Sequence, residues 1–237
     1  MGSGIYVAAA GAVAQSNALD VTANNVANAS TAAFQGSRVS FHEALAKARS
    51  PDLALVGNQT GSIDHANGPI TQTGNPLDLA LDGDGYLAVD SPQGVRYTRA
   101  GALHLDVEGR IVNADNLPVR GANGGPLIVP AGSAQLIVAQ DGPISTEAGP
   151  IGQLALARFG AGALSRDGGT LLSARGAPIA GPPPRVMQGM LEGSNVNVVR
   201  GVVELVQVSR TYESLLRVIE GFKAIESRAA RDLGGPK

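Results

Sequence analysis

Apolar residues in the last part of the chain recur every three or four positions, the spacing of one face of an α-helix. The pattern begins after Asn197 and extends to about residue 230. Asn197 is a candidate N-cap, because its side-chain oxygen can accept an unpaired backbone N–H of the first turn. Charged residues occupy the other side of this predicted helix. Its apolar stripe comprises Val199, Val202, Val203, Leu205, Val206, Tyr212, Leu215, Leu216, Ile219, Phe222 and Ile225.

A second helix is predicted from Ser3 to about Asn28, where a stripe of mostly small residues follows alternating steps of four and three. The stripe comprises Ile5, Ala9, Ala12, Ser16, Leu19, Ala23 and Val26. Small side chains bury little area, so this helix would be marginal alone. Asp20 is the only charged residue before Arg38, which indicates either a helix covered on several sides in an assembly or an ordinary buried helix. Asn24, Asn25 and Asn28 fit its C-terminal end.

The middle of the chain has a different period. We expect a short helix over 38–49, with Phe41 and Leu45 on one face, and an extended linker over 50–68. From Ile70 to Ala157, short apolar runs alternate with Gly, Pro, Asn and Asp turns, which predicts an antiparallel β domain. Residues 160–184 are rich in Gly and Pro and are predicted to be a return linker.

These patterns predict an α+β fold. The N- and C-terminal helices pair with each other as a coiled coil, and an antiparallel all-β domain is inserted between them in the sequence. The expected segments are 1–36 (N-terminal helix segment), 37–69 (linker region), 70–184 (β-rich domain) and 185–237 (C-terminal helix segment).

Composition narrows the function. The 237 residues carry a net charge of -2, which gives no sign of nucleic-acid binding, and they contain no cysteine, which excludes disulfides and thiolate metal sites. No apolar run approaches the roughly 20 residues of a membrane span. The Ala-rich N-terminus lacks the basic start of a signal peptide and continues into the predicted helix, so we expect no cleaved signal.

The candidate catalytic chemistry is weak. His42, His65 and His104 are isolated in the sequence, without metal-ligand spacing. The run from Asp82 to Gly85 is better explained as a β-turn than as a calcium loop, and no phosphate loop or G-x-S-x-G elbow occurs. We therefore predict no catalytic, cofactor or metal site and no enzyme.

Several segments, in order, resemble the flagellar basal-body rod and hook family of axial proteins. Asn24 to Phe34 is similar to the family's Asn-Asn-Leu/Ile-Ala-Asn-x-x-Thr-x-Gly-Phe signature. Further similar segments are Gly68–Asp78, Gly83–Tyr86, Tyr97–Gly101, Leu191–Asn197 and Arg210–Glu213. The start at Ile5 to Ala8 and the short length most resemble the proximal-rod (F-type) branch, and the distal (G-type) branch is the alternative. Ala33 stands where the signature has Gly, Gln35 replaces a basic residue, Val198 replaces Pro and Gly201 replaces an acidic residue.

The resemblance implies a structural subunit that polymerises through its terminal helices into the periplasm-spanning rod and helps to transmit torque. It also implies export through the flagellar export apparatus without a cleaved signal, with the chain itself and other axial proteins as partners and no membrane insertion. The residues expected at the assembly interface are Ile5, Leu19, Asn24, Asn25, Val26, Asn28, Phe34, Asn195, Asn197, Val202, Leu205, Tyr212, Leu216 and Ile219.

Two other functions stay open from the sequence. A secreted binding module could use the β domain to recognise a glycan or envelope protein, with the helices as a stalk. An enzyme would have to use unclustered residues such as Asp78, Asp84 and His104.

Overall fold

The computed structural model describes residues 2–45, 54–133 and 135–233. The chain forms two compact units. We call the first the helical unit (Met1–Ala27, Ser37–Ser62 and Asn197–Lys237) and the second the β unit (Asn28–Gly36 and Ile63–Val196). The chain therefore crosses from one unit to the other after residues 27, 36, 62 and 196.

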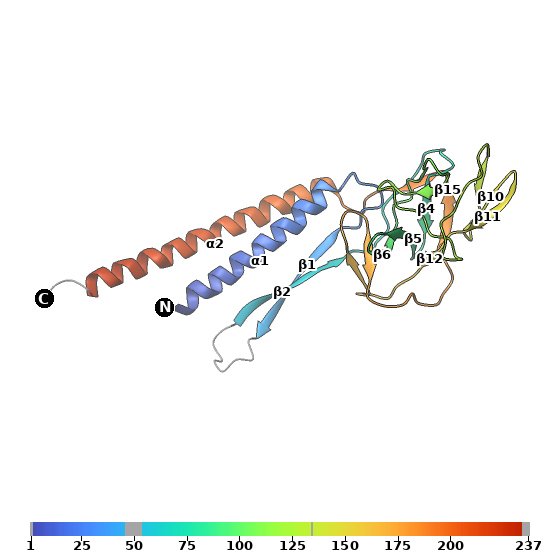
Figure 1. Ribbon diagram of the computed structural model, residues 1–237. Helices are drawn as coiled ribbons and strands as arrows, with labels where there is room; N and C mark the ends of the chain where they lie inside the picture. Colours follow the sequence, from blue (N-terminus) through green and yellow to red (C-terminus); the bar gives the residue numbers. More distant parts are fainter. Residues whose placement is uncertain (1, 46–53, 134, 234–237) are drawn as a thin grey trace. The chain divides into compact units, whose positions relative to one another are not determined.

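The helical unit contains two long helices that lie side by side, α1 (Gly2–Ala27) and α2 (Val198–Leu233) (Figure 1). Gly4 meets Phe222, Gly11 meets Leu215 and Gly201 meets Val26, so the helices run antiparallel. Asn197 caps α2 as predicted, because its Oδ1 accepts the backbone N–H of Arg200 at 3.0 Å. Both predicted helices are confirmed, with bounds within a few residues of the expected ones.

The helical unit also holds a two-stranded sheet of β1 (Ser37–Leu45) and β2 (Ala54–Ile63), and β1 contacts α1. The short helix predicted over 38–49 is therefore wrong for 38–45, and the remainder, 46–49, lies outside the described residues. The expected linker over 50–68 contains β2, while its first residues, 50–53, also lie outside them. The strand conformation depends on pairing between two segments, which the local pattern of one segment does not reveal.

The β unit is built from short strands, and all of its strand pairs in the described residues are antiparallel. They form a five-stranded sheet in the order β12-β5-β6-β14-β13, a three-stranded sheet in the order β11-β10-β9, and the pairs β15-β4, β16-β3 and β7-β8. The strands are β3 (Ile70–Gln72), β4 (Leu79–Asp82), β5 (Tyr86–Ser91), β6 (Gly94–Thr98), β7 (His104–Leu105), β8 (Ile111–Val112), β9 (Leu136–Val138), β10 (Pro143–Thr146), β11 (Gly149–Gln153), β12 (Leu156–Ala157), β13 (Leu164–Arg166), β14 (Leu172–Ala174), β15 (Arg185–Gln188) and β16 (Met190–Glu192).

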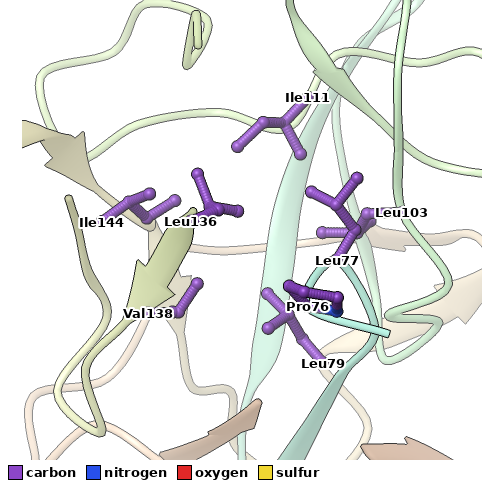
Figure 2. Close-up of a pocket in the computed structure, with 8 residues that line it drawn as sticks. All are labelled: Pro76, Leu77, Leu79, Leu103, Ile111, Leu136, Val138 and Ile144. Carbon is purple, nitrogen blue, oxygen red and sulfur yellow. The ribbon is translucent and has the colours of Figure 1, made fainter. Parts of the chain in front are cut away.

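The core of the β unit is a cluster of aliphatic side chains, in which Leu81, Leu87, Val89 and Val119 are fully buried. Figure 2 shows one part of it, where side chains from β4, β8, β9, β10 and the preceding loops surround a narrow apolar gap. The gap has no room for a water molecule and no polar lining, so it is core packing and offers no ligand site.

The α+β class and the antiparallel β domain agree with the sequence prediction, but the return linker over 160–184 is only partly correct. Strands β13 and β14 lie within it, and β14 completes the larger sheet by pairing with β6. Exposed coil follows from Arg175 to Pro183. Coiled-coil geometry for the helix pair stays a prediction.

Candidate functional site

The face of α2 that turns towards α1 is marked by a regular series of buried or half-buried positions. These positions follow steps of four and three: Gly201, Leu205, Val208, Tyr212, Leu215, Ile219 and Phe222. Leu205, Tyr212 and Ile219 were predicted as interface residues and lie on this face. Gly201 allows close packing, because a Cβ there would lie 2.7 Å from Cγ2 of Val26.

The opposing face of α1 consists of small residues, but it is shifted from the predicted stripe. Ala8, Ala12 and Ala18 are buried, whereas Ala23, which was expected on the stripe, is exposed. The predicted interface residues Ile5, Leu19 and Val26 are half-buried. The spacing alone fitted more than one face, and the contacts of α1 with α2 and β1 determine which residues are buried.

Pairing of the two helices leaves large apolar side chains on both helices open to solvent. On α2, Val199 is 75% exposed and Leu216 39% exposed, and the predicted interface residue Val202 is also exposed. Large apolar residues are likewise exposed on α1, at Tyr6 and Val13. Among the described side chains, the exposed large apolar residues of the two helices are Tyr6, Val7, Val13, Val198, Val199, Val202, Val203, Val206, Leu216, Val218 and Ile225.

The three asparagines near the end of α1 differ in their hydrogen bonds and exposure. Asn25 forms a two-way pair with the backbone of Ser37, accepting its N–H at 2.9 Å and donating to its carbonyl at 2.7 Å. Asn28 accepts the backbone N–H of Thr31 through its own carbonyl at 3.0 Å, and its side chain accepts the Thr31 hydroxyl at 3.3 Å. Asn24 is exposed.

Asn195 is a hub in the β unit. Its Oδ1 accepts the N–H of Gly36 at 2.7 Å, and its Nδ2 donates to the carbonyls of Asp64 and Ala66, both at 2.9 Å. Its backbone N–H donates to the carbonyl of Phe34 at 3.1 Å. One side chain thus fixes three chain segments, and an amide is needed because both a donor and an acceptor are used.

Phe34 is buried at the same place, with the Arg166 guanidinium 4.5 Å from the centre of its ring. The preceding residue, Ala33, donates its N–H to the carbonyl of Glu192 at 2.8 Å and has a φ of 54°. The segment that follows α1 is therefore folded onto the segment that precedes α2, and both belong to the β unit.

A buried ion pair lies beneath these segments, and no role for it was predicted. Arg99 Nε donates to Glu192 Oε2 at 2.8 Å, with side chains 2% and 1% exposed. The same guanidinium donates to the carbonyls of Leu81, Gly83 and Gly85, and Glu192 Oε1 accepts the N–H of Gly68 at 3.0 Å. Both residues stand in segments singled out by the family resemblance, but their partnership across 93 positions has no local signal.

His65, Tyr86 and Gln35 form a second polar cluster. The Tyr86 hydroxyl lies 2.8 Å from His65 Nδ1 and donates to Gln35 Oε1 at 3.2 Å. Burial lowers the pKa of His65, although Asp64 and Asp84 oppose the shift, and burial raises the pKa of Tyr86. Within the described ranges, Gln35 Nε2 is buried without an acceptor. These contacts join Gln35, which follows α1, to Tyr86 on β5 and to His65.

Comparisons with known proteins identify the family to which these segments belong. Family descriptions match three segments: "Flagella basal body rod protein" at residues 5–35, "Flagellar hook protein FlgE/F/G D1 domain" at 80–146 and "Flagellar basal body rod FlgEFG protein C-terminal" at 187–231. The rod protein FlgF of Escherichia coli (strain K12) is 35% identical over 249 residues, covering 98% of this chain and 97% of that protein. The chain belongs to the flagellar basal-body rod protein family.

Other rod proteins match over most of their length. FlgF of Rhizobium meliloti (strain 1021) is 29% identical with full coverage of both chains (100% and 100%). FlgG of Bacillus subtilis (strain 168) is 31% identical, covering 85% of this chain and 88% of that protein. Within the family the chain is most like the proteins named FlgF, as the sequence comparison by motif predicted. Like those rod proteins, it is a structural protein and not an enzyme.

The matched rod segments coincide with the surfaces described above. Residues 5–35 contain most of α1 together with Ala33 and Phe34, and residues 187–231 contain Glu192, Asn195 and most of α2. Both sides of the helix pair, and both sides of the contact between Ala33 and Glu192, are therefore rod-family segments. In the described part of the chain, no group of three or more acidic or histidine side chains could hold a metal, and neither helix could cross a membrane.

Ala33→Gly is expected to stabilise this rod protein by up to about 1 kcal/mol. An L-residue with a side chain is disfavoured at positive φ, whereas Gly adopts it freely, and this gain exceeds the extra entropy that Gly loses on folding. Urea unfolding followed by circular dichroism measures the change. Ala29→Gly is the matched control, because Ala29 lies in the same segment without a positive φ and should lose stability. A midpoint for Ala33→Gly below that of the parent chain would contradict the argument.

Proposed function

We propose that the chain is a structural subunit of the flagellar rod that polymerises through its terminal helices. The observation that carries this proposal is the number of large apolar side chains left exposed on α1 and α2 after they pair with each other. Apolar side chains exposed in such numbers on paired helices favour burial against a partner. The exposed interface candidates Val202 and Leu216 are assigned to contacts with neighbouring copies or other rod proteins.

The helix pair is proposed to pack as a coiled coil in the assembled rod. Alternating steps of four and three on α2, from Gly201 to Phe222, are the spacing that keeps one seam facing a partner helix. The small residues Ala8, Ala12 and Ala18 on α1 favour close approach of the helix backbones. A contact that does not close on itself by rotation generates a helical filament.

Torque transmission is proposed to use the asparagine and ion-pair contacts of the rod-family segments. The chain crosses between its units after residues 27, 36, 62 and 196. Within the β unit, Asn195 binds Gly36 and Asp64, which stand beside two of these crossings, and lies next to a third itself. A load that enters along one segment is thereby shared with the others.

The location follows from the family. We propose the periplasm-spanning rod, in its proximal part rather than the distal part, with export through the flagellar export apparatus and without a cleaved signal. The proposed partners are the chain itself and other axial proteins. A net charge of -2 gives no support for a nucleic-acid partner. We propose no membrane insertion.

Isolation of basal bodies from a strain that produces a tagged chain tests the proposal. We expect the full-length chain to be in the rod, and a variant without residues 199–226 to be absent from it. Retention of the truncated chain at the envelope through its β unit would instead favour the secreted binding module. Absence of the full-length chain from basal bodies would overturn the rod function.

A further inference from the structure

We propose that His65, Tyr86 and Gln35 form a proton-sensitive switch inside the β unit. In this switch, protonation of His65 fixes the direction of a hydrogen-bond chain and leaves the buried amide nitrogen of Gln35 without a partner. Acid then weakens the hold of the β unit on the segment that follows α1. The switch goes beyond the rod function and does not depend on it.

The three side chains form one continuous chain of polar contacts. The Tyr86 hydroxyl stands in the middle, 2.8 Å from His65 Nδ1 and 3.2 Å from Gln35 Oε1. Tyr86 and Gln35 are buried, whereas His65 at the other end is half-buried and can exchange its proton with water. A change of protonation at His65 can therefore act on the buried Gln35 through Tyr86.

The chain of contacts can run in two directions, because the Tyr86 hydroxyl has a single hydrogen. In the first direction, His65 Nδ1–H donates to the Tyr86 oxygen and the Tyr86 hydroxyl donates to Gln35 Oε1, so that Gln35 Nε2 is buried without an acceptor in the described part of the chain. In the second direction, the Gln35 amide is turned by about 180°. Its Nε2 then donates to the Tyr86 oxygen, and the Tyr86 hydroxyl donates to His65 Nδ1.

Protonation of His65 excludes the second direction. A neutral imidazole can accept at Nδ1, but an imidazolium carries a hydrogen on both ring nitrogens and accepts nothing. The second direction leaves an amide oxygen of Gln35 unpaired instead of its nitrogen, which buried sites tolerate better. Because an unpaired buried donor is costly, neutral His65 is favoured while the three residues are in contact.

The charged groups around His65 do not cancel this preference. Burial lowers the pKa of His65, Asp64 and Asp84 oppose the shift, and Arg99 adds to it. The Asp84 side chain is 84% exposed, so water screens its charge. At the other end of the chain of contacts, the Arg166 guanidinium donates to the backbone carbonyl of Gln35. With the pKa below its ordinary value of 6.5, stability is fully present above that pH and falls as the pH drops through it.

The switch lies where two segments of the β unit are tied together. Asp64 donates its backbone N–H to the carbonyl of Gly36 at 2.8 Å. Asn195 accepts the N–H of Gly36 and donates to the carbonyl of Asp64. Gln35 and His65 are the adjoining residues on these segments, and the chain crosses between its units after residues 36 and 62. The Gly36 N–H therefore reports how firmly the two segments are joined.

Amide exchange of the purified full-length chain tests the switch. Between about pH 8 and about pH 5, the range in which a histidine titrates, the protection of the Gly36 N–H should fall roughly tenfold after correction for intrinsic exchange. His65→Gln cannot be protonated and should keep the protection constant. His104→Gln is the matched control, because His104 is exposed and contacts Asn116 outside the switch, and it should behave like the parent chain. Constant protection in the parent chain, or a fall of equal size in His65→Gln, would overturn the switch.

A second experiment distinguishes the chain of contacts from burial alone. In a His42→Gln/His104→Gln background, His65 is the only histidine, and NMR follows its titration. Gln35→Met removes an amide that bonds Tyr86 and is expected to raise the pKa of His65, because neutral His65 no longer gives a buried N–H its partner. When Tyr86→Phe is also present, Gln35→Met should leave this pKa unchanged. The same shift with Tyr86 and with Phe, or no shift with Tyr86, would contradict the proposal without bearing on the rod function.

Discussion

Glu192→Gln is expected to lower the free energy of unfolding of the β unit by about 3–5 kcal/mol, the usual loss when one partner of a buried ion pair is removed. The variant leaves the Arg99 guanidinium in a site that is almost closed to water, where only carbonyl groups remain to pair with it. Thermal unfolding of the full chain should show a fall in Tm on the order of 10 °C.

Asp90→Asn provides the matched control. Asp90 and Arg120 form an ion pair at 2.5 Å in the same unit, but their side chains are 34% and 33% exposed. Loss of this pair should cost less than about 1 kcal/mol, because water solvates the remaining charge. A Glu192→Gln variant as stable as Asp90→Asn would show that the buried pair is not what holds these segments together.

The double variant Arg99→Met/Glu192→Met separates the ion pair from its hydrogen bonds. Apolar replacement of both partners of a buried pair is often neutral. Here it also removes the donor for the carbonyls of Leu81, Gly83 and Gly85, and buried polar groups without partners are costly. We therefore expect the double variant to stay less stable than the parent chain. Full recovery would mean that these carbonyls find other partners.

The features that the sequence predicted correctly are those determined by neighbouring residues. Asn197 caps α2 because the cap bond reaches only three positions along the chain, to Arg200. The spans of both helices follow from repeated apolar spacing over many turns. The short strands β5 and β6 are joined by a turn and pair with each other, so their alternation and turn residues were sufficient to find them.

The features that the sequence did not predict depend on distant partners. Ser37–Leu45 is a strand because it pairs with Ala54–Ile63, although the spacing of Phe41 and Leu45 also fits a helix. Arg99 and Glu192 were visible only as parts of separate motifs. Ala33 replaces the signature glycine, which makes a positive φ less favourable there, and the structure shows that Ala33 adopts a positive φ nevertheless.

The sequence also did not show which of Leu215 and Leu216 packs against α1, because both fit the apolar spacing of α2. Leu215 is half-buried against α1, where a Cβ on Gly11 would lie 3.5 Å from its Cδ1. Leu216 is 39% exposed on the outer surface of the helix pair. The sequence placed Leu216 at the assembly interface without distinguishing contacts within the chain from contacts between copies, and only the position of α1 separates the two.

Leu216→Asp is expected to abolish incorporation into the rod while leaving the isolated chain folded. An aspartate on the outer surface costs the monomer little, but in the assembled rod it would be a buried charge without a partner, which is strongly unfavourable. Motility on soft agar and the amount of the chain in isolated basal bodies measure the loss. Circular dichroism of the purified variant should show the helical content of the parent chain.

Leu215→Asp makes the same change of residue and charge as Leu216→Asp, one position earlier on α2. We expect a different result from it. It places the carboxylate between α1 and α2, so the isolated chain should lose helical signal and α1 should become sensitive to protease. The lost burial of the leucine side chain alone lowers the free energy of unfolding by about 1.5–3 kcal/mol. The small residues of α1 offer no other contact that would replace it. Normal motility of Leu216→Asp would remove the outer surface from the assembly interface, and intact helices in Leu215→Asp would contradict the observed pairing.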